Sequence, residues 1–234
     1  MSYSSLLSCA NVLHPGGLPL TQRAFSRIGL PEKAKVLDIG CGAGFTVDYL
    51  NTSIGLQAVG MDLQPRIPSS PHQVPSPLPI IRALAEDLPV ASCCLDAVVA
   101  ECVLSLMTEL CVVFCEICRV LKPAGKLILS DVYLLKDVEA QLTHYLRRDE
   151  YLKHFWTKSK WERELAKWGL QIIQWEDHTR ALQVFAAQTI LAGCPLDPAL
   201  PLVAAGGNFC GEVHERLDRV SLGYFMGIAA KVKE

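Results

Sequence analysis

A glycine-rich segment at residues 36–44, with the sequence VLDIGCGAG, constrains the fold of this chain more than any other feature. An apolar run ends here in alternating glycines, and a helix is expected from about Phe45 to Asn51, so the segment predicts a buried strand, a tight turn and a helix. Glycine permits positive φ and lets a ligand approach the backbone closely. The N–H groups at the start of the following helix can receive a negative group. In an open α/β sheet, such a turn lies at the carboxyl end of the first strand, where ligands bind.

The spacing of these glycines narrows the choice of ligand. A dinucleotide-binding loop requires G-x-G-x-x-G, and here Phe45 occupies the position of the third glycine. The spacing is instead G-x-G-x-G, and Asp38 stands two positions before the first glycine. No Gly-Lys-Ser/Thr follows, which excludes a Walker-type phosphate loop.

The rest of the chain predicts the architecture around this turn. Strands are expected at 35–39, 56–61, 80–84, 96–103, 126–131, 170–175 and 222–231, and helices at 20–28, 45–51, 108–121, 138–168 (mostly helical) and 179–191. These strands are nearly continuous apolar runs that alternate with helices over the first part of the chain, which is typical of a parallel sheet covered on both faces. We therefore predict an α/β fold: a Rossmann-like, doubly wound, mainly parallel seven-stranded sheet with helices on both faces.

The glycine segment resembles motif I of the class I S-adenosylmethionine-dependent methyltransferases, in which D-x-G-x-G is the usual form. Residues 59–62 (VGMD) resemble the end of the family's second strand, and residues 85–89 (AEDLP) resemble its adenine segment. Residues 96–101 (DAVVAE) resemble its fourth strand. Residues 119–125 (RVLKPAG) resemble the helix-turn before the fifth strand in the ubiquinone/menaquinone-type, methyltransferase-11-like subgroup, and the lead-in resembles that of uncharacterised bacterial members.

This resemblance implies S-adenosyl-L-methionine as the cofactor and a set of residues that bind it. They are Asp38, Gly40, Cys41, Gly42, Gly44, Asp62, Leu63, Glu86, Asp87, Leu88 and Glu101. Asp38 would order the turn and meet the methionyl amino group, and Asp62 would accept the ribose hydroxyl protons. The acidic pair at 86–87 would meet the adenine amine. Asp38 could instead only cap the turn, and the acidic pair could be a solvated turn or a helix cap.

The resemblance also suggests how the chain is organised. We expect a single domain over residues 1–234, with 1–34 as an N-terminal lead-in or cap and 35–132 as the cofactor-binding half. Residues 133–234 would supply substrate-side helices and the last strands. Between residues 64 and 79, six prolines replace the helix that usually follows the second strand, so an extended loop is expected there.

Composition limits the partners of the protein. The formal net charge is -2 and no long basic run occurs, which disfavours DNA or RNA. No apolar segment is long enough to span a membrane, and the apolar stretch near the N-terminus is too short for a signal-peptide core. We therefore expect a cytoplasmic protein with a small-molecule substrate. The sequence leaves its oligomeric state open.

Cysteines and histidines offer alternative chemistries. The chain has ten cysteines, for which a disulfide framework is not expected. Cys111, Cys115 and Cys118 fall at helical spacing, and we interpret them as core residues, with a metal or metalloid site as the alternative. Cys41 is interpreted as a small residue that the turn requires, not as a nucleophile. The histidines are interpreted as surface or capping residues, and His178 has the best case as a base.

The expected activity is methyl transfer to an unidentified small molecule. Because the cofactor is already activated, the protein mainly positions and desolvates the reactants, so the sequence names no catalytic residue. Residues near the methyl group should come from the lead-in, from 101–105 and from the region after Asp131. The alternatives are a non-catalytic binding protein with the same fold, an arsenite-type metalloid methyltransferase, and a nicotinamide-dependent oxidoreductase, which Phe45 disfavours.

Overall fold

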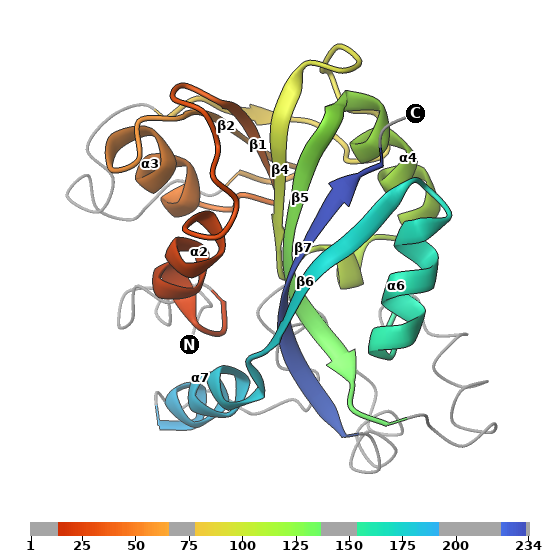
Figure 1. Ribbon diagram of the computed structural model, residues 1–234. Coiled ribbons are helices and arrows are strands. Elements are labelled where there is room, and N and C mark those ends of the chain that lie inside the picture. The colour runs from red at the N-terminus through yellow and green to blue at the C-terminus, as the bar shows by residue number, and fades with distance from the viewer. Residues whose placement is uncertain (1–13, 66–77, 137–153, 192–220, 233–234) are drawn as a thin grey trace.

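The computed structural model in Figure 1 describes residues 14–65, 78–136, 154–191 and 221–232. Most of the proline-rich loop, the first part of the helical stretch expected at 138–168, and the loop expected at about 193–211 lie outside these residues. No helix within the described ranges is long and apolar enough to cross a membrane.

A seven-stranded sheet forms the centre of the molecule (Figure 1). Its strands are β1 (Lys35–Ile39), β2 (Gln57–Asp62), β3 (Ile80–Arg82), β4 (Leu95–Glu101), β5 (Leu121–Leu134), β6 (Leu170–Asp177) and β7 (Leu222–Lys231). They are ordered β3-β2-β1-β4-β5-β7-β6. Only β7 is antiparallel to its neighbours, β5 and β6, while the remaining pairs are parallel. The predicted doubly wound, mainly parallel sheet is confirmed.

Helices cover both faces of this sheet (Figure 1). The helices α2 (Gly17–Phe25), α3 (Phe45–Thr52) and α7 (Thr179–Leu191) contribute side chains to one core cluster, and α4 (Leu110–Val120) and α6 (Lys158–Ala166) contribute to the other. A short 3-10 helix, η1 (Leu104–Leu106), follows β4.

Successive residues of the central strand β4 pack into opposite cores. Ala97 and Val99 belong to the cluster under α2 and α3, whereas Val98 and Ala100 belong to the cluster under α4 and α6. Side chains alternate across a strand, so a strand covered on both faces must be apolar at every position. The continuous apolar runs in the sequence have this physical origin.

Several boundaries differ from the sequence prediction. The strand expected at 126–131 begins at Leu121 and extends to Leu134, because Leu121 already pairs with Leu95 ahead of a β-bulge. The preceding helix α4 ends at Val120, and Pro123 lies inside the irregular start of the strand. Prolines are tolerated at such irregular positions.

The long helix expected at 138–168 is only partly confirmed in its described part, where α6 covers Lys158–Ala166. Residues 154–157 are not helical, and Thr157 forms an isolated parallel bridge with Leu134 before α6 begins. Phe155, Trp156 and Trp161 of this region are all buried core residues.

Candidate cofactor-binding site

The glycine turn joins β1 to α3 in a left-handed backbone conformation. The φ angles of Gly40, Gly42 and Gly44 are 72°, 55° and 80°. The N–H of Gly40 and the N–H of Cys41 both donate to the carbonyl of Met61 at the end of β2, at 2.7 and 3.1 Å. The turn is thereby fixed against the neighbouring strand.

The three glycines of the turn are required for two different reasons. A Cβ on Gly40 would lie 2.4 Å from Cγ2 of Val103, and one on Gly44 would lie 2.6 Å from Cδ1 of Leu78. A Cβ on Gly42 would meet no protein atom within 4 Å. Gly40 and Gly44 thus allow close packing within the protein, whereas Gly42 borders open space where a ligand can approach the backbone.

Asp62 ties the end of β2 to this turn. Its Oδ2 accepts a hydrogen bond from the N–H of Gly42 at 2.9 Å, and its Oδ1 accepts one from the N–H of Gln64 at 2.8 Å. An ionised carboxylate oxygen can accept more than one hydrogen bond, so Asp62 keeps acceptor capacity for ligand hydroxyls. The adjacent Leu63 is 52% exposed at the same edge.

Asp38 and Glu101 bring further negative charge to this edge of the sheet. Asp38 is only 3% exposed. Burial first, then the nearby charges of Glu101 and Asp62, raise the pKa of Asp38 well above its usual value. Within the described residues, neither Asp38 nor Asp62 forms an ion pair with a lysine or arginine. Three acidic side chains thus gather at the carboxyl end of the sheet, an arrangement that suits a positively charged ligand group.

Glu101, at the carboxyl end of β4, is held by residues that sequence reasoning missed. Its Oε1 accepts the hydroxyl proton of Thr21 at 2.8 Å, and its Oε2 accepts that of Thr46 at 2.9 Å. His14 Nε2 lies 3.7 Å from Oε2 of Glu101, with 11% of the His14 side chain exposed. The interpretation of His14 as a surface residue is wrong, because the chain folds its imidazole back onto Glu101. No local pattern could have joined these three distant segments.

The segment at 85–92 is clamped onto α4 by Arg119. Nη2 of Arg119 donates to the carbonyl of Leu88 at 3.0 Å, and Nη1 donates to that of Val90 at 2.8 Å. Glu116 accepts from the N–H of Leu88 at 2.8 Å and pairs with Arg119 at 2.7 Å. Leu88 is buried, whereas Glu86 is half-buried and Asp87 is exposed at the surface.

Replacing Arg119 with methionine is expected to destabilise the protein by about 1–3 kcal/mol, because two backbone carbonyls and Glu116 lose a donor. The measurement is urea unfolding followed by circular dichroism. The matched control is Arg163→Met, which alters an exposed arginine on α6 and should stay within about 0.5 kcal/mol of the parent. Equal losses in the two variants would show that the clamp contributes nothing specific.

Cys41 agrees with its interpretation as a small residue required by the turn. It is buried, and a Cβ on Gly60 would lie 2.7 Å from its Sγ, so the thiol fills the space above that glycine. Burial, with the negative charges of Asp38 and Asp62, raises the pKa of Cys41 far above that of an ordinary thiol. Such a thiol stays protonated and is a poor nucleophile.

The cysteines on α4 do not lie in the core, so the packing interpretation is wrong for two of them. Cys111 and Cys115 are exposed and Cys118 is half-buried. The buried face of α4 consists of Leu110, Val113, Phe114, Ile117 and Val120. The cysteines follow the same helical spacing displaced by one position, which carries them off the buried face. Among the described residues, no group of three His, Cys, Asp or Glu could hold a metal ion.

Alkylation of the native protein should follow this exposure. Iodoacetamide is expected to label the exposed Cys93, Cys111 and Cys115 well before Cys41, which should react only after unfolding. Mass spectrometry of peptides over time measures the labelling. Serine at either exposed position should change stability by no more than about 0.5 kcal/mol. Labelling of Cys41 at the rate of Cys115 would contradict the buried position of the turn.

His178 belongs to a contact between α2 and β6. Its Nε2 lies 3.3 Å from Oε2 of Glu176, which also binds Arg23 and Arg27 of the α2 region. The hydrogen bond from Arg23 is the main cause that lowers the pKa of Glu176 to about 2. Glu176 therefore acts as an ionised anchor for two arginines.

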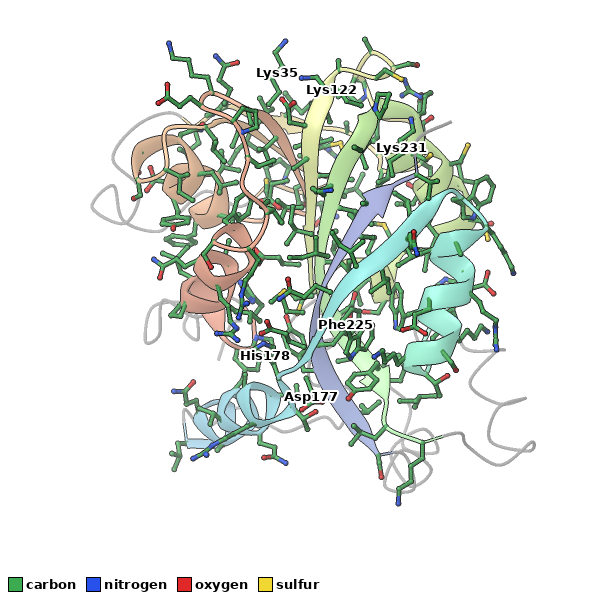
Figure 2. All side chains as sticks on the ribbon, viewed as in Figure 1. Lys35, Lys122, Asp177, His178, Phe225 and Lys231 are labelled. Atoms are coloured by element: carbon green, nitrogen blue, oxygen red, sulfur yellow. The ribbon has the colours of Figure 1, made fainter. Side chains whose placement is uncertain are left out.

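Charged residues are segregated along the sheet. Figure 2 shows Lys35, Lys122 and Lys231 near one end of the strands, and Asp177 and His178 near the other. Lys122 pairs with Asp96 at 2.6 Å, and Lys231 donates to main-chain carbonyls at the end of α4. The carboxyl edge, where the glycine turn lies, thus keeps its negative charge.

This arrangement of strands and turn is the fold of class I methyltransferases. The structure aligns with that of a putative sarcosine dimethylglycine methyltransferase from Galdieria sulphuraria, with a TM-score of 0.70 and 16% identity, over 92% of this chain and 84% of that chain. It also aligns with phosphoethanolamine N-methyltransferase 2 of Haemonchus contortus in complex with S-adenosyl-L-methionine. That alignment has a TM-score of 0.66 and 19% identity and covers 100% of this chain and 60% of that chain.

Sequence comparison also finds similarity to methyltransferases. Residues 37–129 match the methyltransferase domain family. The uncharacterized methyltransferase YodH of Bacillus subtilis strain 168 is 29% identical over 175 residues, which cover 72% of this chain and 74% of that protein. The part of the chain that holds the glycine turn, residues 37–129, thus matches a methyltransferase domain.

Proposed function

We propose that this protein binds S-adenosylmethionine against the glycine turn and transfers its methyl group to a small molecule. The observation that carries the proposal is the meeting of three carboxylates, Asp38, Asp62 and Glu101, beside a turn whose Gly42 faces open space. The cofactor carries a sulfonium and an α-ammonium group, and both favour an anionic pocket.

Two of these carboxylates have separate roles in this proposal. Asp38 receives the methionyl ammonium group and Asp62 receives the ribose hydroxyls. The adenine lies along Leu63 and the 86–88 segment, which Arg119 holds in place. Cys41, Gly40 and Gly44 shape the turn itself.

A small acceptor agrees with the charge of the molecule. The formal net charge is -2, and Lys122 and Lys231 are engaged at the opposite edge of the sheet. We propose that residues 1–34 and 133–234 enclose the acceptor within a single domain around the cofactor-binding half, residues 35–132. A cytoplasmic location belongs to the same proposal, since ten cysteines suit a reducing compartment.

The first test is thermal stabilisation. A ligand that binds only the native state at 100 times its Kd adds about 2.7 kcal/mol. In a protein of this size that corresponds to a rise in Tm of about 5–10 °C. S-adenosylhomocysteine should produce this rise, and NAD at the same concentration should leave Tm unchanged. The reverse ranking of the two ligands would end the proposal.

A methyl-release assay over a panel of metabolites separates an enzyme from a non-catalytic binding protein. Turnover of any compound supports the enzyme, whereas tight cofactor binding without turnover favours the binding protein. An arsenite-type acceptor has no support from the exposed cysteines, because no group of three ligands forms in the part of the chain that the structure describes.

A further inference from the structure

A tight turn carries the lead-in back toward the glycine turn. Gly16 and Gly17 have φ angles of 83° and 50°, and the N–H of Gly17 donates to the carbonyl of His14 at 3.0 Å. A Cβ on Gly16 would lie 3.0 Å from the Leu20 side chain, so this reversal requires glycine. The turn places the His14 imidazole over the end of β4.

His14 meets the most enclosed carboxylate of the site. Its Nε2 lies 3.7 Å from Oε2 of Glu101, and their side chains are only 11% and 8% exposed. Glu101 is fixed from both sides by the Thr21 and Thr46 hydroxyls, and its charge acts on Asp38. His14 thus lies beside the carboxylate whose charge acts on Asp38. The proposed function places the methionyl end of the cofactor at Asp38.

Among the described residues, the hydrogen bonds of the imidazole involve only one of its two nitrogens. Nδ1 of His14 lies 3.2 Å from the carbonyl of Pro15, so the tautomer with a proton on Nδ1 can donate there. The Nε2 lone pair is then unprotonated, and 3.7 Å is too long for a hydrogen bond to Glu101. A donor on a bound substrate can use that lone pair, and the adjacent carboxylate would stabilise the imidazolium that results.

We infer that His14 is the general base of methyl transfer, that Glu101 is its positioning residue, and that the acceptor is an amine or hydroxyl compound with a dissociable proton. The inference rests on the proposed function. In the step, the acceptor nitrogen or oxygen forms a bond to the methyl carbon while the methyl–sulfur bond breaks. The electron pair of that bond stays on sulfur, which becomes the neutral thioether of S-adenosylhomocysteine. The proton passes to His14 Nε2 and then to solvent.

The charged groups around His14 are carboxylates from three neighbouring strands. Glu101 of β4 faces the imidazole, and Asp38 of β1 and Asp62 of β2 lie behind it. From α2 and α3, the neutral hydroxyls of Thr21 and Thr46 approach Glu101. Within the described residues, no lysine or arginine pairs with His14 or Glu101.

The experiment compares His14→Gln with His178→Gln, which removes a second partly buried histidine that also contacts a glutamate. Radiolabelled S-adenosylmethionine is offered with primary and secondary amines, phenols and alcohols, and separately with tertiary amines and thioethers, between pH 5.5 and 9. Titration calorimetry with S-adenosylhomocysteine reports cofactor binding by each variant.

We expect turnover only of acceptors that carry a proton. His14→Gln should keep cofactor affinity within about 3-fold but lose about 100-fold or more in kcat. His178→Gln should match the parent in both measurements.

Three results would overturn the inference alone while the parent still binds S-adenosylhomocysteine: an unchanged kcat in His14→Gln, turnover confined to tertiary amines or thioethers, or no turnover of any compound offered. Failure of the parent to bind S-adenosylhomocysteine would instead overturn the proposed function, and the inference with it.

Discussion

Gly42→Val is expected to lose S-adenosylhomocysteine binding by at least about 100-fold while the protein remains folded. A Cβ at this position meets no protein atom within 4 Å, so the side chain would enter the space reserved for the ligand. The backbone cost is limited to about 1–2 kcal/mol, the penalty for a side chain at positive φ. Titration calorimetry measures the affinity, and circular dichroism measures the fold.

Gly29→Val is a closely matched control for this variant. Gly29 has the same φ of 55° as Gly42, and a Cβ there also meets nothing within 4 Å, but it lies between α2 and β1, away from the turn. Both variants should lose similar stability, and only Gly42→Val should lose binding. Normal affinity in Gly42→Val would show that the ligand does not approach this turn.

Asp38→Asn is expected to act in opposite directions on stability and on binding. Burial, followed by the charges of Glu101 and Asp62, raises the pKa of Asp38, so its ionised form destabilises the unliganded protein. Asparagine has nearly the same shape without the charge, so the variant should have a higher Tm near neutral pH. Its affinity for S-adenosylhomocysteine should fall by about 10–100-fold, since a hydrogen bond to a charged group contributes about 1.5–3 kcal/mol.

The stability difference between Asp38→Asn and the parent should depend on pH. Between the unfolded pKa of about 3.9 and the higher folded pKa, the folded parent binds the extra proton. Its stability therefore falls as pH rises through that window. Asp38→Asn lacks this fall, so its advantage over the parent should be absent near pH 3 and develop as the pH rises. Urea unfolding at a series of pH values measures the difference.

Asp96→Asn provides a control of opposite sign. Although burial opposes it, the hydrogen bond from Lys122, with that from the Lys35 N–H, lowers the pKa of Asp96. Its charge therefore favours the folded state, and the variant should be less stable than the parent at neutral pH. A loss of stability in Asp38→Asn at neutral pH would contradict the destabilising effect that we assign to the ionised Asp38.

The boundaries of some helices and strands could be predicted directly from the sequence, because they depend only on residues close together along the chain. Lys35–Ile39, Thr179–Leu191 and Leu222–Lys231 have the predicted boundaries, because apolar runs and turn residues mark where each begins and ends. The start of β5 could not be read, because its first pair with Leu95 is a contact between distant segments. The exposure of Cys111 and Cys115 also escaped prediction, since α4 packs a face displaced by one residue.

The sequence by itself determined the class of fold and the place of the glycine turn. Both follow from local chemistry: apolar strands that must be buried on two faces, and glycines where the backbone requires positive φ. Only the tertiary structure decided that Glu101 accepts hydrogen bonds from Thr21 and Thr46 and lies beside His14. These side chains come from the lead-in, the first helix of the sheet and the fourth strand, and no spacing along the chain encodes their meeting. They come together because parallel strands align their carboxyl ends at one edge, and the helices packed on the sheet deliver their polar residues to it.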